Sequence, residues 1–268
     1  MSFLNSFSRY YCAPTCVLHI FFFTFAFRLK RNTNVSTFFR NIKRALRLCQ
    51  RQAKDAFSRE HFARQRQHPS VAQRSVSVEQ PFTASATLQA KRHNLALAAR
   101  RISAYVVMPG EVFSFWRAVG NPNTSAFQAS RGLRAGRVEI ERGGGLCQIS
   151  GILHHLALLA GLHVVERHSH SLDLYTEQTR FCPLGSDATV SYGYLDLRFR
   201  NTLAGPIWFA FDVGEATFRA TLHCAADFKP HTIVFRRTEE TPYRLAAEAY
   251  DETTGQVLCR STYKRLEA

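Results

Sequence analysis

The feature that most constrains this chain is a run of three glycines, Gly143, Gly144 and Gly145, that leads directly into an apolar helix. The apolar residues that follow recur near the 3.6-residue period of a helix with a buried face. They are Leu146, Ile149, Ile152, Leu153, Leu156, Leu159 and Ala160. Gly161 then stands where a glycine commonly ends a helix. The pattern predicts a core helix that carries a cysteine, Cys147, in its first turn.

The position of Cys147 favours chemistry at its sulfur. The first backbone N–H groups of a helix have no partner within the helix and carry partial positive charge, which favours the reactive thiolate. Glycines let a substrate approach the backbone, where the same N–H groups could receive a developing negative oxygen. We therefore expect Cys147 as a nucleophile, with substrate held by the three glycines, Gln148 and Ser150. The structural alternative is a buried, inert cysteine behind an ordinary tight turn.

Two histidines follow this helix in a polar loop. Residues 162–167 are predicted to form a short returning strand, which would bring its far end back beside the start of the helix. His168 or His170 would then lie near Cys147, where a neutral imidazole can take the thiol proton. We choose His168, because it directly follows the strand and its position is better fixed than that of His170.

An acidic side chain could orient that imidazole as the third member of a Cys–His–acid arrangement. The candidates are Asp187, in a turn, and Asp196, on the polar face of a predicted strand. We favour Asp187. The alternatives are a turn-stabilising side chain for Asp187 and a surface pair with Arg198 or Arg200 for Asp196.

Five ordered motifs in this sequence resemble those of the VanW-like family. They are residues 108–116 (MPGEVFSFW), 143–150 (GGGLCQIS), 164–171 (VVERHSHS), 187–190 (DATV) and 195–201 (LDLRFRN). The resemblance runs from about residue 85 to about residue 230. It implies a link to vancomycin resistance and, for some members, L,D-transpeptidase activity on peptidoglycan with the motif cysteine as nucleophile. The resemblance carries that role to Cys147 alone.

The function expected from these features is cysteine acyl transfer on a peptidoglycan peptide or precursor. Cys147 would attack a peptide carbonyl, release the terminal amino acid and pass the acyl group to an amine or to water, a reaction that needs no cofactor. Two alternatives remain. One is a non-catalytic module that holds a cell-wall precursor or another anion at the helix N-terminus. The other is a metal site built from Cys147, His168 and His170.

The charge of the chain is concentrated near its N-terminus. The formal net charge is +15, and residues 28–66 hold twelve Lys and Arg against two acidic residues. Residues 37–62 are predicted to form a basic helix with an intermittent apolar stripe, which suits an anionic membrane surface. Nucleic acid would attract the same charges, but we do not expect it as a partner. The alternative is a solvated basic face packed on the domain.

The extreme N-terminus carries no convincing export signal. Residues 17–27 are largely apolar, which is shorter than the roughly 20 residues of a spanning helix. Their basic cluster follows the apolar stretch, whereas in a signal peptide it precedes it. The seven cysteines form no disulfide framework, and scattered thiols favour a reducing compartment. We expect a cytoplasmic or membrane-associated protein.

The remaining patterns predict an α+β fold, with a mostly antiparallel sheet on which the Cys147 helix packs. Alternation of apolar and polar residues indicates a strand at residues 195–200. A hairpin signal at Val213 and Gly214 indicates strands at residues 206–213 and 215–223, and further short strands are expected at residues 231–238, 244–250 and 256–264. The expected organisation has four parts. These are an apolar segment (1–30) that is an anchor or a misassigned start, a basic helix and linker (31–84), a VanW-like domain (85–230) and a C-terminal β extension (231–268).

Overall fold

The computed structural model describes residues 33–134, 137–173, 180 and 182–265. The chain divides into two compact units, residues 1–50 and 51–268. The apolar segment expected at residues 1–30 lies outside the described residues. What the structure describes of the first unit is most of helix α2 (Thr33–Phe57), whose last seven residues belong to the second unit.

Helix α2 is strongly amphipathic. It starts before and ends before the helix expected at residues 37–62. It ends early because the chain leaves the helical conformation after Phe57, and Arg59 adopts a positive φ. Phe38, Ile42 and Leu46 recur every four residues, so they lie on one face, and all three are exposed. Among the described residues, no helix combines the length and the apolar character that crossing a membrane requires.

The second unit is built around a five-stranded antiparallel sheet with the strand order β1-β3-β10-β11-β2. Its strands are β1 (Arg64–Gln65), β3 (Tyr105–Val107), β10 (Ile207–Val213), β11 (Thr217–Cys224) and β2 (Arg74–Pro81). The hairpin of β10 and β11 forms as predicted, with Gly214 in its turn. The chain after residue 67 was expected to be a linker, and this prediction is wrong for β2. That segment pairs along its whole length with β11, so its role is set by a partner strand more than a hundred residues away.

Three smaller sheets complete the unit. One contains β4 (Val112–Ser114), β9 (Arg198–Arg200) and β7 (His163–Glu166), and another pairs β5 (Ala129–Arg134) with β6 (Arg137–Arg142). The C-terminal sheet contains β12 (Ile233–Glu240), β13 (Arg244–Asp251) and β14 (Gln256–Arg265). Its fourth strand is β8 (Leu172–Asp173), which pairs with β14 in parallel. Every other pairing between these named strands is antiparallel.

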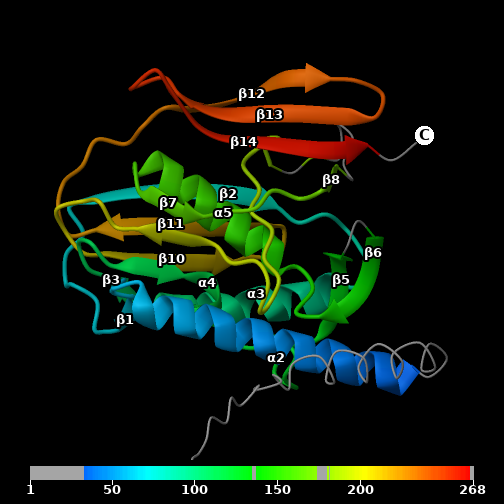
Figure 1. The fold of residues 1–268 in the computed structure, drawn as a ribbon. Helices are drawn as coiled ribbons and strands as arrows, with labels where there is room; N and C mark the ends of the chain where they lie inside the picture. Colours follow the sequence, from blue (N-terminus) through cyan, green and yellow to red (C-terminus); the bar gives the residue numbers. More distant parts are fainter. Residues whose placement is uncertain (1–32, 135–136, 174–179, 181, 266–268) are drawn as a thin grey trace, which may run out of the picture. The chain divides into compact units, whose positions relative to one another are not determined.

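Three helices of the second unit pack on these sheets. They are α3 (Leu88–Ser103), α4 (Phe115–Val119) and α5 (Leu146–Leu159). Helix α5 packs against β2 and β11 on one side, while His155 packs edge-on against Phe235 of β12. Figure 1 shows α5, in green, between the C-terminal sheet and the five-stranded sheet. The described part of the chain is therefore α+β with mostly antiparallel sheets, as predicted.

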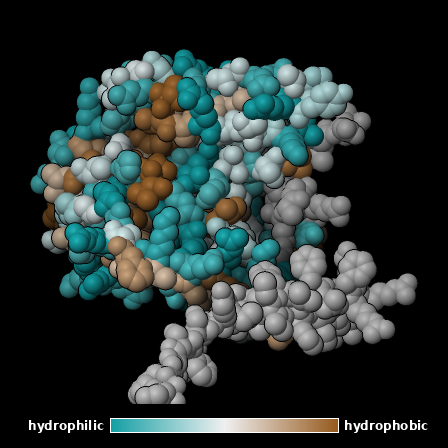
Figure 2. Space-filling model, in the orientation of Figure 1, coloured by the Kyte–Doolittle hydropathy of each residue, from teal (hydrophilic) through white to brown (hydrophobic). Residues whose placement is uncertain are grey.

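The surface view agrees with this arrangement. On the face drawn in Figure 2, most exposed residues are hydrophilic, and hydrophobic residues gather over the region of α5. Eleven of the fourteen residues of α5 are buried, including Ile149, Ile152 and Leu153 at no measurable exposure. The helix is apolar on nearly every side because elements cover it on nearly every side.

A stacked aromatic group stabilises the core beside the three-stranded sheet. Phe113 on β4 stacks on Phe199 on β9, with ring centroids 4.8 Å apart, and both rings contact Phe209 on β10. All three side chains are fully buried. These rings therefore join two sheets that share no strand pairing.

We expect Phe113→Ala to lower the free energy of unfolding by about 3–5 kcal/mol, because it leaves a cavity between two sheets. Urea denaturation of the full chain measures this change. Tyr243→Ala is the matched control, because Tyr243 is 71% exposed and its loss should change stability by less than about 0.5 kcal/mol. Equal effects of the two substitutions would contradict the role assigned to the aromatic group.

Candidate active site

The glycine turn is required by close packing at the start of α5. Gly145 precedes the helix with φ +94°, a left-handed conformation that glycine adopts at little cost. Gly144 is buried against β5, and a Cβ at this position would lie 2.2 Å from the carbonyl oxygen of Ser130. The backbone of the turn therefore approaches β5 more closely than any side chain would permit.

This turn places Cys147 at the second position of α5, as predicted. Its side chain is partly buried, and its sulfur lies 3.6 Å from the Thr189 hydroxyl and 3.8 Å from the Val190 carbonyl oxygen. Among the described residues, none accepts a hydrogen bond from the backbone N–H of Cys147. A thiol and an unoccupied donor thus lie together at the positive end of the helix.

His170 is the histidine that acts on this sulfur. Its Nδ1 lies 2.7 Å from Oδ2 of Asp187, and its hydrogen bonding and charge lower the pKa of the Cys147 thiol. Because Nδ1 is engaged by the carboxylate, Nε2 is the ring nitrogen left for the sulfur. Cys147, His170 and Asp187 thus form an array of sulfur, imidazole and carboxylate.

The Asp187 carboxylate is fully engaged. Oδ2 accepts hydrogen bonds from Nδ1 and from the backbone N–H of His170, the latter at 2.7 Å. Oδ1 accepts from the Tyr263 hydroxyl and from Arg167, whose Nη2 lies 3.2 Å away. These four donors to Oδ1 and Oδ2 fix the carboxylate in one orientation. The Arg167 Nε also donates to the backbone carbonyl of Asp187 at 2.8 Å.

The electrostatics of the array favour a thiolate beside an imidazolium. Burial raises the pKa of the Cys147 thiol, but the hydrogen bond and charge of His170 more than offset this, so the net pKa is lowered. Burial lowers the pKa of His170, yet Asp187 and Cys147 together raise it to about 10. Burial likewise opposes ionisation of Asp187, but His170, Arg167 and Tyr263 hold the pKa of this carboxyl well below its usual range. The array therefore shifts Cys147 toward its reactive, ionised form.

His168 does not lie where the sequence argument placed it. Its Nε2 lies 3.2 Å from Oε1 of Glu166, and its side chain is 40% exposed. The His168 carbonyl instead accepts a hydrogen bond from the backbone N–H of Thr189 at 2.7 Å. The preference for His168 as the neighbour of Cys147 is therefore corrected to His170, because Asp187 holds the ring and the backbone N–H of His170 while His168 turns to Glu166.

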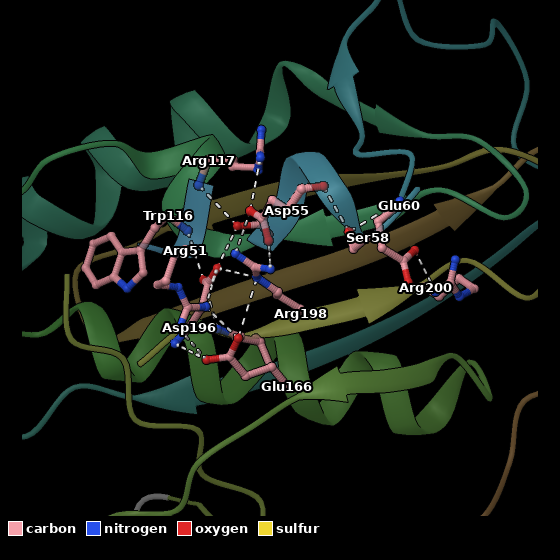
Figure 3. Close-up of polar contacts among 12 residues, drawn as sticks. Arg51, Asp55, Ser58, Glu60, Trp116, Arg117, Glu166, Asp196, Arg198 and Arg200 are labelled. Carbon is pink, nitrogen blue, oxygen red and sulfur yellow. Dashed lines mark hydrogen bonds and ion pairs between the residues drawn. The ribbon is translucent and has the colours of Figure 1, made fainter. Parts of the chain in front are cut away.

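Asp196, the second acidic candidate, belongs to a separate buried network (Figure 3). It accepts hydrogen bonds from the Ser114 hydroxyl at 2.7 Å and from Nε of Arg198 at 2.9 Å. The alternative role considered for Asp196 was a surface pair with Arg198 or Arg200. Arg198 is indeed its partner, but the Asp196 side chain is almost fully buried, so the pair is internal. Buried carboxylates persist where several donors satisfy them, which assigns Asp196 to the packing of β4 on β9.

The same network explains why the predicted strand at residues 195–200 is shorter in the structure. The backbone N–H of Asp196 donates to Glu166 instead of to a partner strand, and the regular strand β9 begins only at Arg198. Glu166 also pairs with Arg51, and Asp55 pairs with Arg198 and Arg117 (Figure 3). Arg51 and Asp55 are thereby tied into the second unit.

The polar side chains expected to hold substrate are turned into the core. The Ser150 hydroxyl donates to the carbonyl of Ala188 at 2.6 Å, and the Gln148 amide nitrogen lies 3.5 Å from the carbonyl of Pro81. Both side chains are buried. Ser150 thus fixes the segment next to Asp187, while the backbone of the glycine turn stays beside Cys147.

Sequence reasoning did not single out Arg167, Thr189 or Tyr263. Arg167 and Thr189 lie inside two of the ordered motifs, so those motifs were the signal that could have found them. Tyr263 is 76 residues from its partner Asp187 in an ordinary-looking strand and gave no local signal. Among the described residues, no group of three or more His, Cys, Asp or Glu side chains is placed to hold a metal ion.

Comparison with known proteins agrees with the motifs. The family model described as VanW like protein matches residues 90–223, which is half of the chain, so the chain belongs to the VanW-like family. The matched range contains Cys147, His170 and Asp187.

Two curated relatives share this region. The uncharacterized protein YoaR of Bacillus subtilis is 37% identical over 120 residues, which cover 44% of this chain and 38% of that protein. Vancomycin B-type resistance protein VanW of Enterococcus faecalis is 33% identical over 125 residues, 46% of each chain. The chain spans less than half the length of these relatives. No solved structure matches it.

We expect Cys147 to be alkylated at least about tenfold faster than Cys182 or Cys259 at pH 6–7, because its lowered pKa favours the thiolate. Burial raises the pKa of Cys182 to about 11 and also raises that of Cys259, so these thiols react only at higher pH. Pulse alkylation with mass mapping measures all three rates in one sample. All three thiols are partly buried, so access is matched. Equal rates would show that the array does not activate Cys147.

Proposed function

We propose that this protein is a cysteine acyltransferase of the L,D-transpeptidase type that acts on peptidoglycan peptides. The observation that carries the proposal is the array of Cys147, His170 and Asp187 at the start of α5. This combination of nucleophile, base and orienting acid is what acyl transfer requires. The substrate class is supported by membership of the VanW-like family and by the name of the relative from Enterococcus faecalis.

Each group of the array has a defined task in the proposed reaction. The Cys147 thiolate attacks the carbonyl carbon of a peptide bond, and the resulting oxyanion accepts a hydrogen bond from the Cys147 backbone N–H. The C–N bond then breaks as Nε2 of His170 gives its proton to the departing amine, which leaves a thioester on Cys147. Neutral His170 next takes a proton from an acceptor amine or from water, whose attack on the thioester frees the thiol.

Intact-mass analysis after incubation with peptidoglycan fragments tests this function. We expect an acyl adduct on Cys147, no adduct on Cys147→Ala, and a rate about 10²–10⁴-fold lower for His170→Ala, the usual range for loss of an acid–base group. His168→Ala is the matched control and should change the rate little, because His168 contacts Glu166 instead of the sulfur.

The alternative function, a module that holds a cell-wall precursor without catalysis, predicts a different outcome. Such a module would bind the same fragments without forming any adduct, and Cys147→Ala would bind them as the unchanged protein does. Binding with no mass change at any pH between 6 and 9 would replace the acyltransferase proposal by this one.

We also propose that α2 attaches the protein to an anionic membrane surface. Exposed Phe38, Ile42 and Leu46 form an apolar stripe, and the exposed basic residues Lys43 and Arg47 lie on the same helix. An interfacial helix needs both parts, because its apolar face enters the lipid while its cations meet the headgroups. Each Lys or Arg near such a surface contributes about 1 kcal/mol, and salt weakens the attraction.

Replacing Phe38, Ile42 and Leu46 together by serine should reduce pelleting with phosphatidylglycerol vesicles by at least about tenfold. Substitution is preferable to deletion up to residue 70, because a deletion also removes β1 and the buried Ala63. Serine at Val71 and Tyr243, two other exposed apolar residues, is the matched control. Unchanged pelleting of the triple variant, or equal pelleting with neutral phosphatidylcholine vesicles, would refute the attachment.

A further inference from the structure

We propose that the C-terminal sheet is part of the active site and that Tyr263 on β14 is a positioning residue for the Cys147–His170–Asp187 array. The inference rests on the proposed function for its biological meaning, but it concerns the state of the Cys147 thiol and can be tested without a substrate. Residues 233–265, which form β12 to β14, lie beyond the 90–223 range of the family match.

Tyr263 reaches the acid of the array from the side opposite His170. Its side chain is buried, and its hydroxyl donates to Oδ1 of Asp187. Oδ2 of the same carboxylate serves His170 alone, through the ring Nδ1 and the backbone N–H. The two oxygens are thus divided between the C-terminal sheet and the histidine, so the Tyr263 contact sets the plane in which the carboxylate meets the imidazole.

A second contact links the same strand to the array through Arg167. Nη1 of Arg167 donates to the hydroxyl of Ser261 on β14 at 2.7 Å, while Nη2 of the same guanidinium lies 3.2 Å from Oδ1 of Asp187. Ser261 is buried, and the Arg167 side chain is only 6% exposed. Ser261 and Tyr263 are two residues apart, so they lie on the same face of β14. One face of β14 therefore supports Asp187 directly, through Tyr263, and indirectly, through the contact of Ser261 with Arg167.

The third contact holds the chain that follows His170. Strand β14 pairs in parallel with β8, which begins two residues after His170, and the Lys264 backbone N–H donates to the Ser171 carbonyl at 2.9 Å. A two-residue strand has little stability alone, so its course depends on β14. The C-terminal sheet thus fixes both the acid and the backbone that carries the base.

Three further titratable groups near Asp187 among the described residues are uncharged at neutral pH. Burial lowers the pKa of His154 on α5 to about 3, raises that of Cys182 to about 11, and raises that of Cys259 on β14. Arg167 and His170 are therefore the cations that face the carboxylate. Tyr263 is a neutral donor there, because burial and Asp187 raise the pKa of its hydroxyl far above its usual value.

Loss of the Tyr263 hydroxyl has a definite electrostatic direction. A buried carboxylate that loses a donor is less stable in its charged form, so the pKa of Asp187 rises. A carboxylate that Tyr263 no longer holds at Oδ1 is also less fixed in its orientation toward the imidazole, so it stabilises the His170 imidazolium less, which lowers the pKa of His170. A weaker imidazolium in turn stabilises the thiolate less, so the pKa of Cys147 rises. The Tyr263 hydroxyl acts on the Cys147 sulfur only through Asp187 and His170. Its effect on the pKa of Cys147 is therefore the effect of a positioning residue.

The test is the pH profile of Cys147 alkylation in full-length Tyr263→Phe, followed by mass mapping between pH 5 and 9. We expect the profile to move to higher pH and the rate at pH 6 to fall about three- to tenfold, with little change at pH 9. Tyr250→Phe on the neighbouring strand β13 is the matched control and should keep the profile of the unchanged protein. Ser261→Ala, which removes the Arg167 acceptor, should move the profile in the same direction and serves if Tyr263→Phe melts at a much lower temperature.

An unchanged profile in folded Tyr263→Phe, or an equal shift in Tyr250→Phe, would overturn the inference. The outcome is independent of the proposed function, since alkylation needs no peptidoglycan. A shifted profile in a protein that forms no acyl adduct would sustain the positioning role of Tyr263 and refute only the acyltransferase. If Tyr263→Phe forms the adduct with an unchanged rate and pH dependence, the acyltransferase is sustained and the positioning role of Tyr263 is refuted.

Discussion

The structure depends on the burial of α5. A helix that is apolar on nearly every side must be covered on nearly every side, and no single sheet can do this. Strands β2 and β11 cover one side, α3 and β7 cover others, and the C-terminal sheet closes the last. Because the body of the helix is enclosed, its first turn, which carries the partly buried Cys147, is the part where chemistry can take place.

The second requirement is the satisfaction of one buried carboxylate. Asp187 stays ionised in a largely desolvated position only because donors from two segments meet it: Arg167 and His170 from the loop after β7, and Tyr263 from β14. The orientation of the acid in the site therefore depends on the packing of the C-terminal sheet. A change that improves or weakens the contact between β14 and the loop of Asp187 reaches Cys147 without touching it.

The sequence was informative wherever a local pattern had a local cause. The period of α5, its glycine turn and the strands β10 to β14 all follow from residues within a few positions of each other, and the structure confirms them. Membership of the VanW-like family was likewise readable, because the five motifs occur in order along the chain. The linker prediction failed at β2, since a strand paired with a distant partner can lack a strong pattern of its own.

The sequence by itself therefore determined the α+β class, the helix that begins at the glycines, and the placement of Cys147 in its first turn. Only the tertiary structure decided which histidine and which donors complete the site. His168 and His170 carry the same local signal, and the choice between them depends on where the chain turns toward Asp187. Asp196 and Tyr263 were undecidable for the same reason: their partners are Ser114 and Asp187, 82 and 76 residues away. Contacts across such separations arise from the packing of whole elements, which no short stretch of sequence encodes.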